Sequence, residues 1–177
     1  MNNVAQPVAR LDLPAIQALA AGDMAAIDTL IRTRLASDVV LINQVAEHIV
    51  SAGGKAVLFD VNDDKGAEAV ADLGEANARY LRTDVTDEAG VVANVDAARE
   101  FLGGLNVAVN CAGILGAGRV LGREAPMPLE TFSRTVMVNL VGSFNVAKAA
   151  AAAMQGNEAG DDGERGAIVN TASVAAY

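Results

Sequence analysis

Four short strand-like runs, separated by helical stretches, constrain the fold of this chain most. They are "KAVLFDV" at 55–61, "ARYLRTDV" at 78–85, "LNVAVNCAG" at 105–113 and "AIVNTA" at 167–172. The first of these runs is nearly continuously apolar, which is typical of a parallel strand that is buried on both faces. Because each run is separated from the next by enough residues for a crossover helix, the pattern predicts an α/β fold with a doubly wound, Rossmann-like parallel sheet.

Helical signals fill the intervals between these runs. Helices are expected from about residue 62 to Gly74, from Thr86 as a cap to about residue 102, and over 128–154, which is apolar on most of its sides. The polar stretch "QGNEAGDDGERG" at 155–166 then predicts a loop before the last strand.

The first 51 residues have a different pattern. Helices are expected over 12–22, 23–35 and from Ser37 to the glycine at 53, each with a capping residue or a terminal glycine. The sequence therefore predicts an N-terminal helical segment at 1–51 and an incomplete Rossmann-type domain at 52–177.

Charge and composition exclude several classes of partner. The 177 residues carry a formal net charge of −9, which disfavours nucleic acid and anionic membrane surfaces. With one Cys and one His, the chain lacks the usual ligands of a zinc site, and no metal is expected. No apolar run approaches a membrane span, and no leader pattern is recognised, so a cytoplasmic protein without a membrane partner is expected.

Polar and small residues follow each predicted strand. The first strand ends at Asp60, the second at Asp84 and Val85, and the fourth is followed by Ser173; the third ends in a group of four residues, Asn110, Cys111, Ala112 and Gly113. Taken singly, such residues are more often caps or turns than parts of a site. Because the carboxyl ends of parallel strands share one edge of a sheet, where ligands bind, together they predict one site.

These phrases, with "MVNLVGSFNV" at 137–146, resemble the short-chain dehydrogenase/reductase family in order and spacing. The Cys in "NCAG" and the polar insert before the last strand are most similar to its type II 3-hydroxyacyl-CoA dehydrogenase branch. The resemblance implies an NAD-linked oxidoreductase that transfers hydride to or from a 3-hydroxyacyl-CoA or a similar secondary alcohol.

The resemblance also implies roles for single residues. Asp60 is expected to bind the adenosine ribose and to favour NAD over NADP, while Asp84 and Val85 hold the adenine. Asn139 is expected to support a proton relay, and Ser173 to hydrogen-bond the substrate oxygen. The segment from Asn110 to Gly113 is expected to lie along the cofactor.

Two parts of the family pattern are not found. No glycine-rich phosphate loop precedes Lys55, and the family's Tyr-x-x-x-Lys pair would follow Ser173 by about a dozen residues, whereas the sequence ends at Tyr177. In place of the loop, residues 13–55 resemble the start of an octaprenyl-type polyprenyl diphosphate synthase, whose aspartate-rich motifs do not follow.

Loss of turnover is therefore expected. The alternative is a non-catalytic, fused or truncated remnant that binds a nucleotide weakly or pairs with another subunit. The Ala-rich helix near residues 149–153 is the expected surface for a homo-oligomer.

Overall fold

The computed structural model describes residues 41–116, 118–122 and 125–172. Its elements are, in chain order, α3 (Leu41–Ser51), β1 (Ala56–Asp60), α4 (Asp63–Leu73), β2 (Ala78–Arg82), α5 (Glu88–Leu102), β3 (Val107–Asn110), α6 (Leu129–Val136), η2 (Met137–Gly142), α7 (Ser143–Met154) and β4 (Ala167–Asn170). The four predicted strands and their order are confirmed. The helices expected over 12–35 lie outside the described residues.

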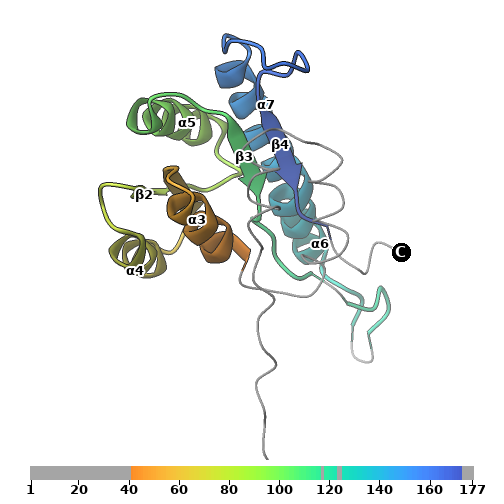
Figure 1. Ribbon diagram of the computed structural model, residues 1–177. Helices are drawn as coiled ribbons and strands as arrows, with labels where there is room; N and C mark the ends of the chain where they lie inside the picture. The colour runs from red at the N-terminus through yellow and green to blue at the C-terminus, as the bar shows by residue number, and fades with distance from the viewer. Residues whose placement is uncertain (1–40, 117, 123–124, 173–177) are drawn as a thin grey trace, which may run out of the picture.

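The strands form two parallel pairs. β1 pairs with β2 from Ala56 opposite Ala78 to Asp60 opposite Arg82, and β3 pairs with β4 from Val107 opposite Ala167 to Asn110 opposite Asn170. Among the described residues each sheet has two strands, so β1 and β3 are both edges. Figure 1 shows β3 and β4 side by side in the middle of the molecule, with β2, α3 and α4 to their left.

Two apolar clusters hold the helices on these pairs. Leu58 of β1 packs with Ala46 of α3 and Ala69 of α4, on one face of the β1–β2 pair. The next residue, Phe59, points to the opposite face and packs against the cluster that α5 and α7 form. The second cluster also receives β3 and β4, and its buried members are Val91, Val95, Leu105, Ala149, Ala150 and Met154. The layered α/β architecture expected from the sequence is thus present.

One helix cap differs from the expectation. The N-cap of α5 is Asp87, whose side chain makes no capping hydrogen bond, rather than Thr86. The Thr86 hydroxyl instead donates to Oδ1 of Asp84 at 2.7 Å, and the Thr86 N–H donates to the same oxygen at 2.9 Å. Because the carboxylate attracts both donors of Thr86, this side chain folds back toward β2 and is not available to the helix.

Residues 129–154 form one continuous helical run. It is 26 residues long, and its most apolar 18-residue window has a mean hydropathy of 1.3, so by length and composition alone it matches a membrane span. A helix over 128–154 that is apolar on most of its sides was expected from the sequence, whereas an apolar run as long as a membrane span was not. A helix that packs on a sheet meets the same test, and α7 packs on β3, β4 and α5.

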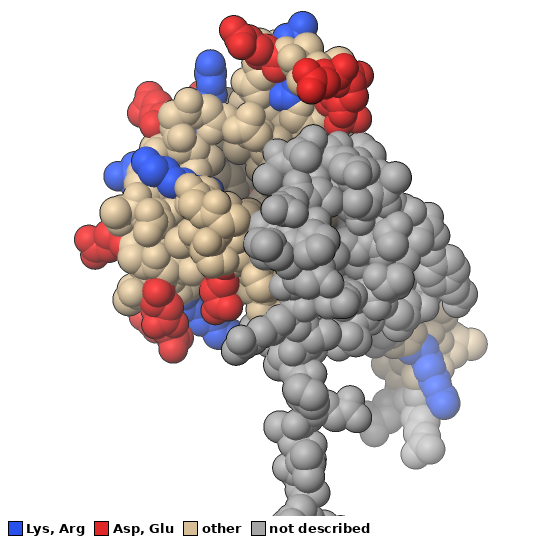
Figure 2. Space-filling model, viewed as in Figure 1, with Lys and Arg blue, Asp and Glu red and all other residues tan. Residues whose placement is uncertain are grey.

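Acidic side chains dominate the charged surface. Figure 2 shows them around the rim of the visible face, most densely at the top, over the loop between α7 and β4. That loop contains Glu158, Asp161, Asp162 and Glu164, all of them exposed.

Candidate functional site

Four of the predicted cofactor residues line one cavity. It has a volume of about 110 Å³, lies between β1 and β3, and reaches Val85, Asn110, Cys111 and Ala112 at the carboxyl ends of the strands. We refer to it as the inter-strand cavity. Asp60, Asp84 and Gly113 do not line it, and Ser173 lies outside the described residues.

Asp60 is exposed at the carboxyl end of β1. The N–H of Asn62 donates to Oδ1 of Asp60 at 2.9 Å, which fixes the carboxylate across the turn into α4. The same turn supplies the N-cap of α4, because Asn62 Oδ1 accepts the N–H of Lys65 at 3.1 Å. The second oxygen of Asp60 has no hydrogen-bond partner among the described residues, so it remains able to accept hydrogen bonds from a ligand.

Asp84 and Val85 are held by separate contacts. The N–H and the hydroxyl of Thr86 hydrogen-bond the carboxylate of Asp84 and hold its pKa below the ordinary value. The C=O of Val85 accepts a hydrogen bond from Nδ2 of Asn145 at 3.0 Å. The backbone group of Val85 that is left for a ligand is therefore its N–H.

Asn110 is buried and is held by other parts of the chain. Its Nδ2 donates to Oδ1 of Asn170 at 2.8 Å and to the C=O of Ser143 at 3.1 Å. These bonds tie the end of β3 to β4 and to the start of α7. The side chain of Asn110 therefore stabilises the fold. Contact between the backbone of Asn110 and a cofactor stays a prediction.

The next residues differ in exposure. Cys111 is half-buried, and burial raises the pKa of its thiol. Ala112 and Gly113 are exposed, so this segment presents little more than backbone to its surroundings. A Cβ on Gly113 would lie 3.6 Å from Oδ1 of Asn139, an ordinary contact, so the space there does not require glycine.

Asn139 fastens the chain that follows β3. Its Oδ1 accepts the N–H of Ile114 at 2.8 Å, and its Nδ2 donates to the C=O of Ile114 at 3.0 Å. Asn139 lies in the π-helical turn η2, between α6 and α7. Such turns are frequent at functional sites, and here the turn places the side chain against the loop at the carboxyl edge of the strands.

Two residues of this region were not expected from the sequence. Gly142 ends η2, and a Cβ there would lie 2.5 Å from Cγ2 of Val85, so close packing of the π-turn on Val85 requires glycine. Tyr80 of β2 has its hydroxyl 2.9 Å from both the C=O of Asp60 and Oδ1 of Asp63. Burial and the hydrogen bond to Asp63 raise the pKa of Tyr80, which makes it a poor acid–base group near neutral pH.

No group of three potential metal ligands occurs among the described residues. The site provides side-chain hydrogen-bond acceptors and backbone N–H donors. Its carboxylates are those of Asp60 and Asp84, and each has one oxygen without a hydrogen-bond partner among the described residues.

Comparison with known proteins identifies the fold. Residues 41–177 match the family model described as short chain dehydrogenase. This chain belongs to the short-chain dehydrogenase family. Among curated members, it is 43% identical over 134 residues to 3-hydroxyacyl-CoA dehydrogenase type-2 of Bos taurus, covering 75% of this chain and 51% of that protein.

Solved structures of other short-chain dehydrogenases share this fold. The 3-hydroxyacyl-CoA dehydrogenase type-2 of Mycobacterium avium superposes with a TM-score of 0.65 at 35% identity, over 72% of this chain and 50% of that one. A 7α-hydroxysteroid dehydrogenase complexed with NADH and 7-oxo glycochenodeoxycholic acid gives 0.63 at 28%, over 75% and 48%. This short-chain dehydrogenase thus spans about half the length of the relatives it matches.

The described residues fit one end of a dinucleotide. The free oxygen of Asp60 and the N–H of Val85 are suited to the hydroxyl and ring-nitrogen groups of an adenosine. The described glycines nearest to β1 on its N-terminal side, Gly53 and Gly54, follow α3 and so lie at the amino end of the strand. No phosphate-binding loop is therefore found at the carboxyl edge among residues 41–60.

Proposed function

We propose that this short-chain dehydrogenase acts with NAD on a 3-hydroxyacyl-CoA or a similar secondary alcohol, and that the described residues supply the adenosine end of the cofactor site. The exposed carboxylate of Asp60 carries the proposal. It lies at the carboxyl end of a parallel strand, it is oriented by Asn62, and one of its oxygens has no hydrogen-bond partner in the part of the chain that the structure describes. A carboxylate in that place accepts hydrogen bonds from both ribose hydroxyls and repels a 2′-phosphate.

The other predicted residues have supporting roles. Asp84 and the N–H of Val85 contact the adenine, and the segment from Cys111 to Gly113 lets the cofactor approach the backbone. Asn139 positions the loop at Ile114 through its two hydrogen bonds. When bound, NAD supplies the hydride acceptor. Ser173 is proposed to hydrogen-bond the substrate oxygen.

A second candidate is a nucleotide-binding module without turnover. It is favoured by Tyr80, whose hydroxyl is engaged by Asp60 and Asp63 and whose pKa is raised, so the described residues offer no tyrosine suited to proton transfer. Loss of a general acid–base group costs roughly 10²- to 10⁴-fold in rate. The division into a helical segment at 1–51 and a partial dehydrogenase domain at 52–177 belongs to this proposal.

Calorimetric titration with NAD and NADP tests the site. We expect NAD to bind more tightly than NADP, and Asp60→Ala to weaken NAD binding about tenfold or more, because a hydrogen bond to a charged group contributes roughly 1.5–3 kcal/mol. Asp64→Ala is the matched control, since Asp64 is an exposed carboxylate on α4 that has no place in the proposed site.

Turnover then separates the two candidates. NADH formation from 3-hydroxybutyryl-CoA that falls in Ser173→Ala supports the dehydrogenase. NAD binding that depends on Asp60 without NADH formation supports the binding module. A chain that does not bind NAD at all contradicts both candidates.

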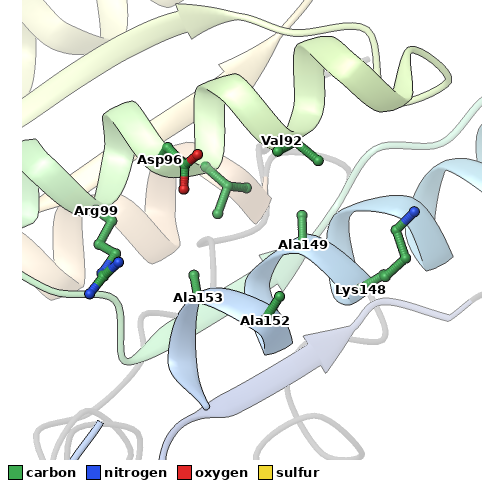
Figure 3. A pocket seen from close by; sticks show the side chains of 8 residues that line it. Val92, Asp96, Arg99, Lys148, Ala149, Ala152 and Ala153 are labelled. Carbon is green, nitrogen blue, oxygen red and sulfur yellow. The ribbon is translucent and has the colours of Figure 1, made fainter. Parts of the chain in front are cut away.

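We further propose that α7 pairs with a second copy of the chain. A groove of about 370 Å³ lies between α5 and α7. Figure 3 shows Ala149, Ala152 and Ala153 on one side of it and Val92, Asp96 and Arg99 on the other. Small residues allow the α7 helices of two copies to approach closely. Because Asp96 and Arg99 lie side by side, the carboxylate of one copy can pair with the guanidinium of the other.

Light scattering after size exclusion tests the pairing. Ala152→Glu places a carboxylate in the groove and is expected to shift the protein to the monomer. Ala71→Glu, an exposed alanine on α4, is the control. A monomeric parent chain at micromolar concentration would show that this surface does not pair copies.

A further inference from the structure

The turn between β1 and α4, which begins at Asp60, is held by two side chains of β2. Tyr80 and Arg82 are two residues apart in β2, so their side chains lie on the same face of the strand, the face that α4 covers. The ring of Tyr80 is in close contact with Gly66 of α4, where an added Cβ would lie 2.2 Å from Cδ2 of the ring. The ring is therefore fixed between β2 and α4, and its hydroxyl has a defined place.

Both side chains bind the carboxylate of Asp63, in the first turn of α4. The Tyr80 hydroxyl donates to Oδ1 of Asp63 at 2.9 Å, and Nη1 of Arg82 donates to Oδ2 at 2.9 Å. Each oxygen of this carboxylate thus has a partner on β2. The side chains of Arg82 and Asp63 are each 63% exposed, so the attraction between their charges contributes little to stability. The effect of these contacts is to fix the geometry of the turn.

The backbone of the turn is bound by the same two side chains. The Tyr80 hydroxyl lies 2.9 Å from the C=O of Asp60. Nη1 of Arg82 donates to the C=O of Val61 at 2.6 Å. That C=O and the N–H of Asn62 belong to one trans peptide unit, and this N–H donates to Oδ1 of Asp60 at 2.9 Å. Because a peptide unit is planar, Arg82 fixes the direction of the N–H that holds the Asp60 carboxylate.

We propose that Arg82, supported by Tyr80, is a positioning residue that orients the Asp60 carboxylate and thereby sets the preference of the site for NAD over NADP. This inference rests on the proposed function, in which Asp60 binds the adenosine ribose. Both residues act through the turn and not by contact with the ribose. Asp60 is exposed, so without a fixed N–H its side chain would exchange between rotamers, and ordering it would cost part of the binding free energy.

NMR of the full chain without ligand tests the orientation of Asp60. Three-bond couplings from its backbone nitrogen and carbonyl carbon to Cγ report the χ1 rotamers, and in the parent chain we expect one rotamer to dominate. Arg82→Met keeps an apolar stem and removes both hydrogen bonds, so the couplings are expected to move toward rotamer averages. Arg82→Lys is expected to restore part of the order, because one nitrogen, Nη1, makes both bonds of Arg82.

Tyr80→Phe is the second variant, and it keeps the ring that packs on Gly66 while it removes the hydroxyl. Its effect on the couplings is expected to be in the same direction and smaller. The reason is that the C=O of Asp60 also accepts the N–H of Thr83 at 2.9 Å and so keeps a partner. This variant tests the turn even where Arg82→Met does not fold, which urea unfolding of each protein establishes.

Arg79→Met is the matched control. Arg79 lies in the same strand and has the same charge, but its side chain points to the other face, where its guanidinium carbon lies 5.1 Å from the centre of the Phe101 ring. We expect this variant to leave the Asp60 couplings unchanged.

Calorimetric titration with NAD and NADP tests the consequence for specificity. In Arg82→Met we expect weaker NAD binding and a ratio of the NADP to the NAD dissociation constant that falls about fivefold, which is the effect of one hydrogen bond of ordinary strength. In Arg79→Met the ratio is expected to stay as in the parent chain. A purely structural defect would weaken the binding of both dinucleotides equally and leave the ratio unchanged.

Asp60 couplings that Arg82→Met leaves unchanged overturn the proposal, whether or not the chain binds NAD. Altered couplings with an unchanged ratio of dissociation constants overturn the link between orientation and cofactor preference. A parent chain that binds neither dinucleotide contradicts the proposed function and, with it, the role in specificity. The couplings in that case still decide whether Arg82 orients Asp60.

Discussion

The carboxamide of Asn139 binds both backbone groups of Ile114. Its Oδ1 accepts the Ile114 N–H at 2.8 Å, and its Nδ2 donates to the Ile114 C=O at 3.0 Å. One side chain in a π-helical turn thereby replaces the two hydrogen bonds that a neighbouring strand would give to the loop after β3.

Asn139→Ala is expected to lower the free energy of unfolding by about 1–3 kcal/mol, because two backbone groups lose their partner. Asn139→Asp keeps the acceptor for the Ile114 N–H and loses the donor to the Ile114 C=O. In urea unfolding it is expected to destabilise the protein less than Asn139→Ala only if a water molecule donates to that C=O instead. Limited proteolysis reports on the loop directly, with faster cleavage between residues 114 and 128 in both variants.

Asn106→Ala serves as the control for this pair, since the side chain of Asn106 is exposed and makes no hydrogen bond among the described residues. Equal stability and equal cleavage rates in Asn139→Ala and Asn106→Ala would contradict the positioning role of Asn139.

Gly142→Ala is expected to destabilise the fold by about 1–3 kcal/mol through overpacking, because the added Cβ would lie 2.5 Å from Cγ2 of Val85. Val85→Ala removes that carbon, so the double variant is expected to be more stable than the sum of the single changes predicts. Thermal or urea unfolding of all four proteins measures the coupling. Gly156→Ala, where an added Cβ meets nothing within 4 Å, should stay within about 0.5 kcal/mol of the parent chain. If the free-energy changes of Gly142→Ala and Val85→Ala simply add in the double variant, the Cβ added at position 142 does not contact Val85.

The pKa of Asp84 predicts a pH-dependent contribution to stability. Because hydrogen bonds from Thr86 lower this pKa in the folded state, the stabilisation is present above the ordinary carboxyl value, near pH 4, and is lost as the pH falls through the lower folded-state pKa. Asp84→Asn is therefore expected to destabilise the chain at pH 7 by about 1 kcal/mol or less, given the exposure of the carboxylate. The difference between the two proteins should shrink below pH 4 in urea titrations. A difference that stays constant from pH 7 to pH 3 would show that the charge of Asp84 contributes nothing.

Cys111 is expected to react slowly with iodoacetamide at pH 7.5, because burial raises the pKa of its thiol and lowers the thiolate fraction. As this is the one cysteine of the chain, mass spectrometry of the intact protein follows it without ambiguity. We expect modification at least tenfold slower than in urea-unfolded protein at the same pH, and faster as the pH rises above 9. Equal rates in the folded and unfolded protein would place the thiol in solvent.

Sequence reasoning located the strands because each is a short run between two helical stretches and because Gly74 and Gly103 stop the helices that precede β2 and β3. Both glycines have positive φ, which other residues rarely adopt. It also found the carboxyl-end residues, since position after a buried strand is visible in the sequence.

What the sequence could not give depends on contacts between distant residues. The π-turn at Asn139 has the same apolar periodicity as the α-helix on either side, so no local signal marks it. The side-chain hydrogen bonds of Asn110 reach Asn170, 60 positions away, and Ser143, 33 positions away. The Thr86 side chain can bond either the Asp84 carboxylate or the first backbone N–H groups of α5. Both partners are local, and residue type alone does not decide between them.

The division of the sheet has a consequence for cooperativity. The two strands of each pair are close in sequence and are joined by a helix or a helical run. The apolar cluster of α5 and α7, against which Phe59, Ala108 and Ile168 pack, forms a seam between the two pairs. Loosening of this seam at Val91 or Ala150 would uncouple the halves and let each one unfold at its own denaturant concentration. A ligand that contacts both strand pairs would couple their unfolding. Its first measurable effect would be a steeper unfolding transition, without a change in the folded structure.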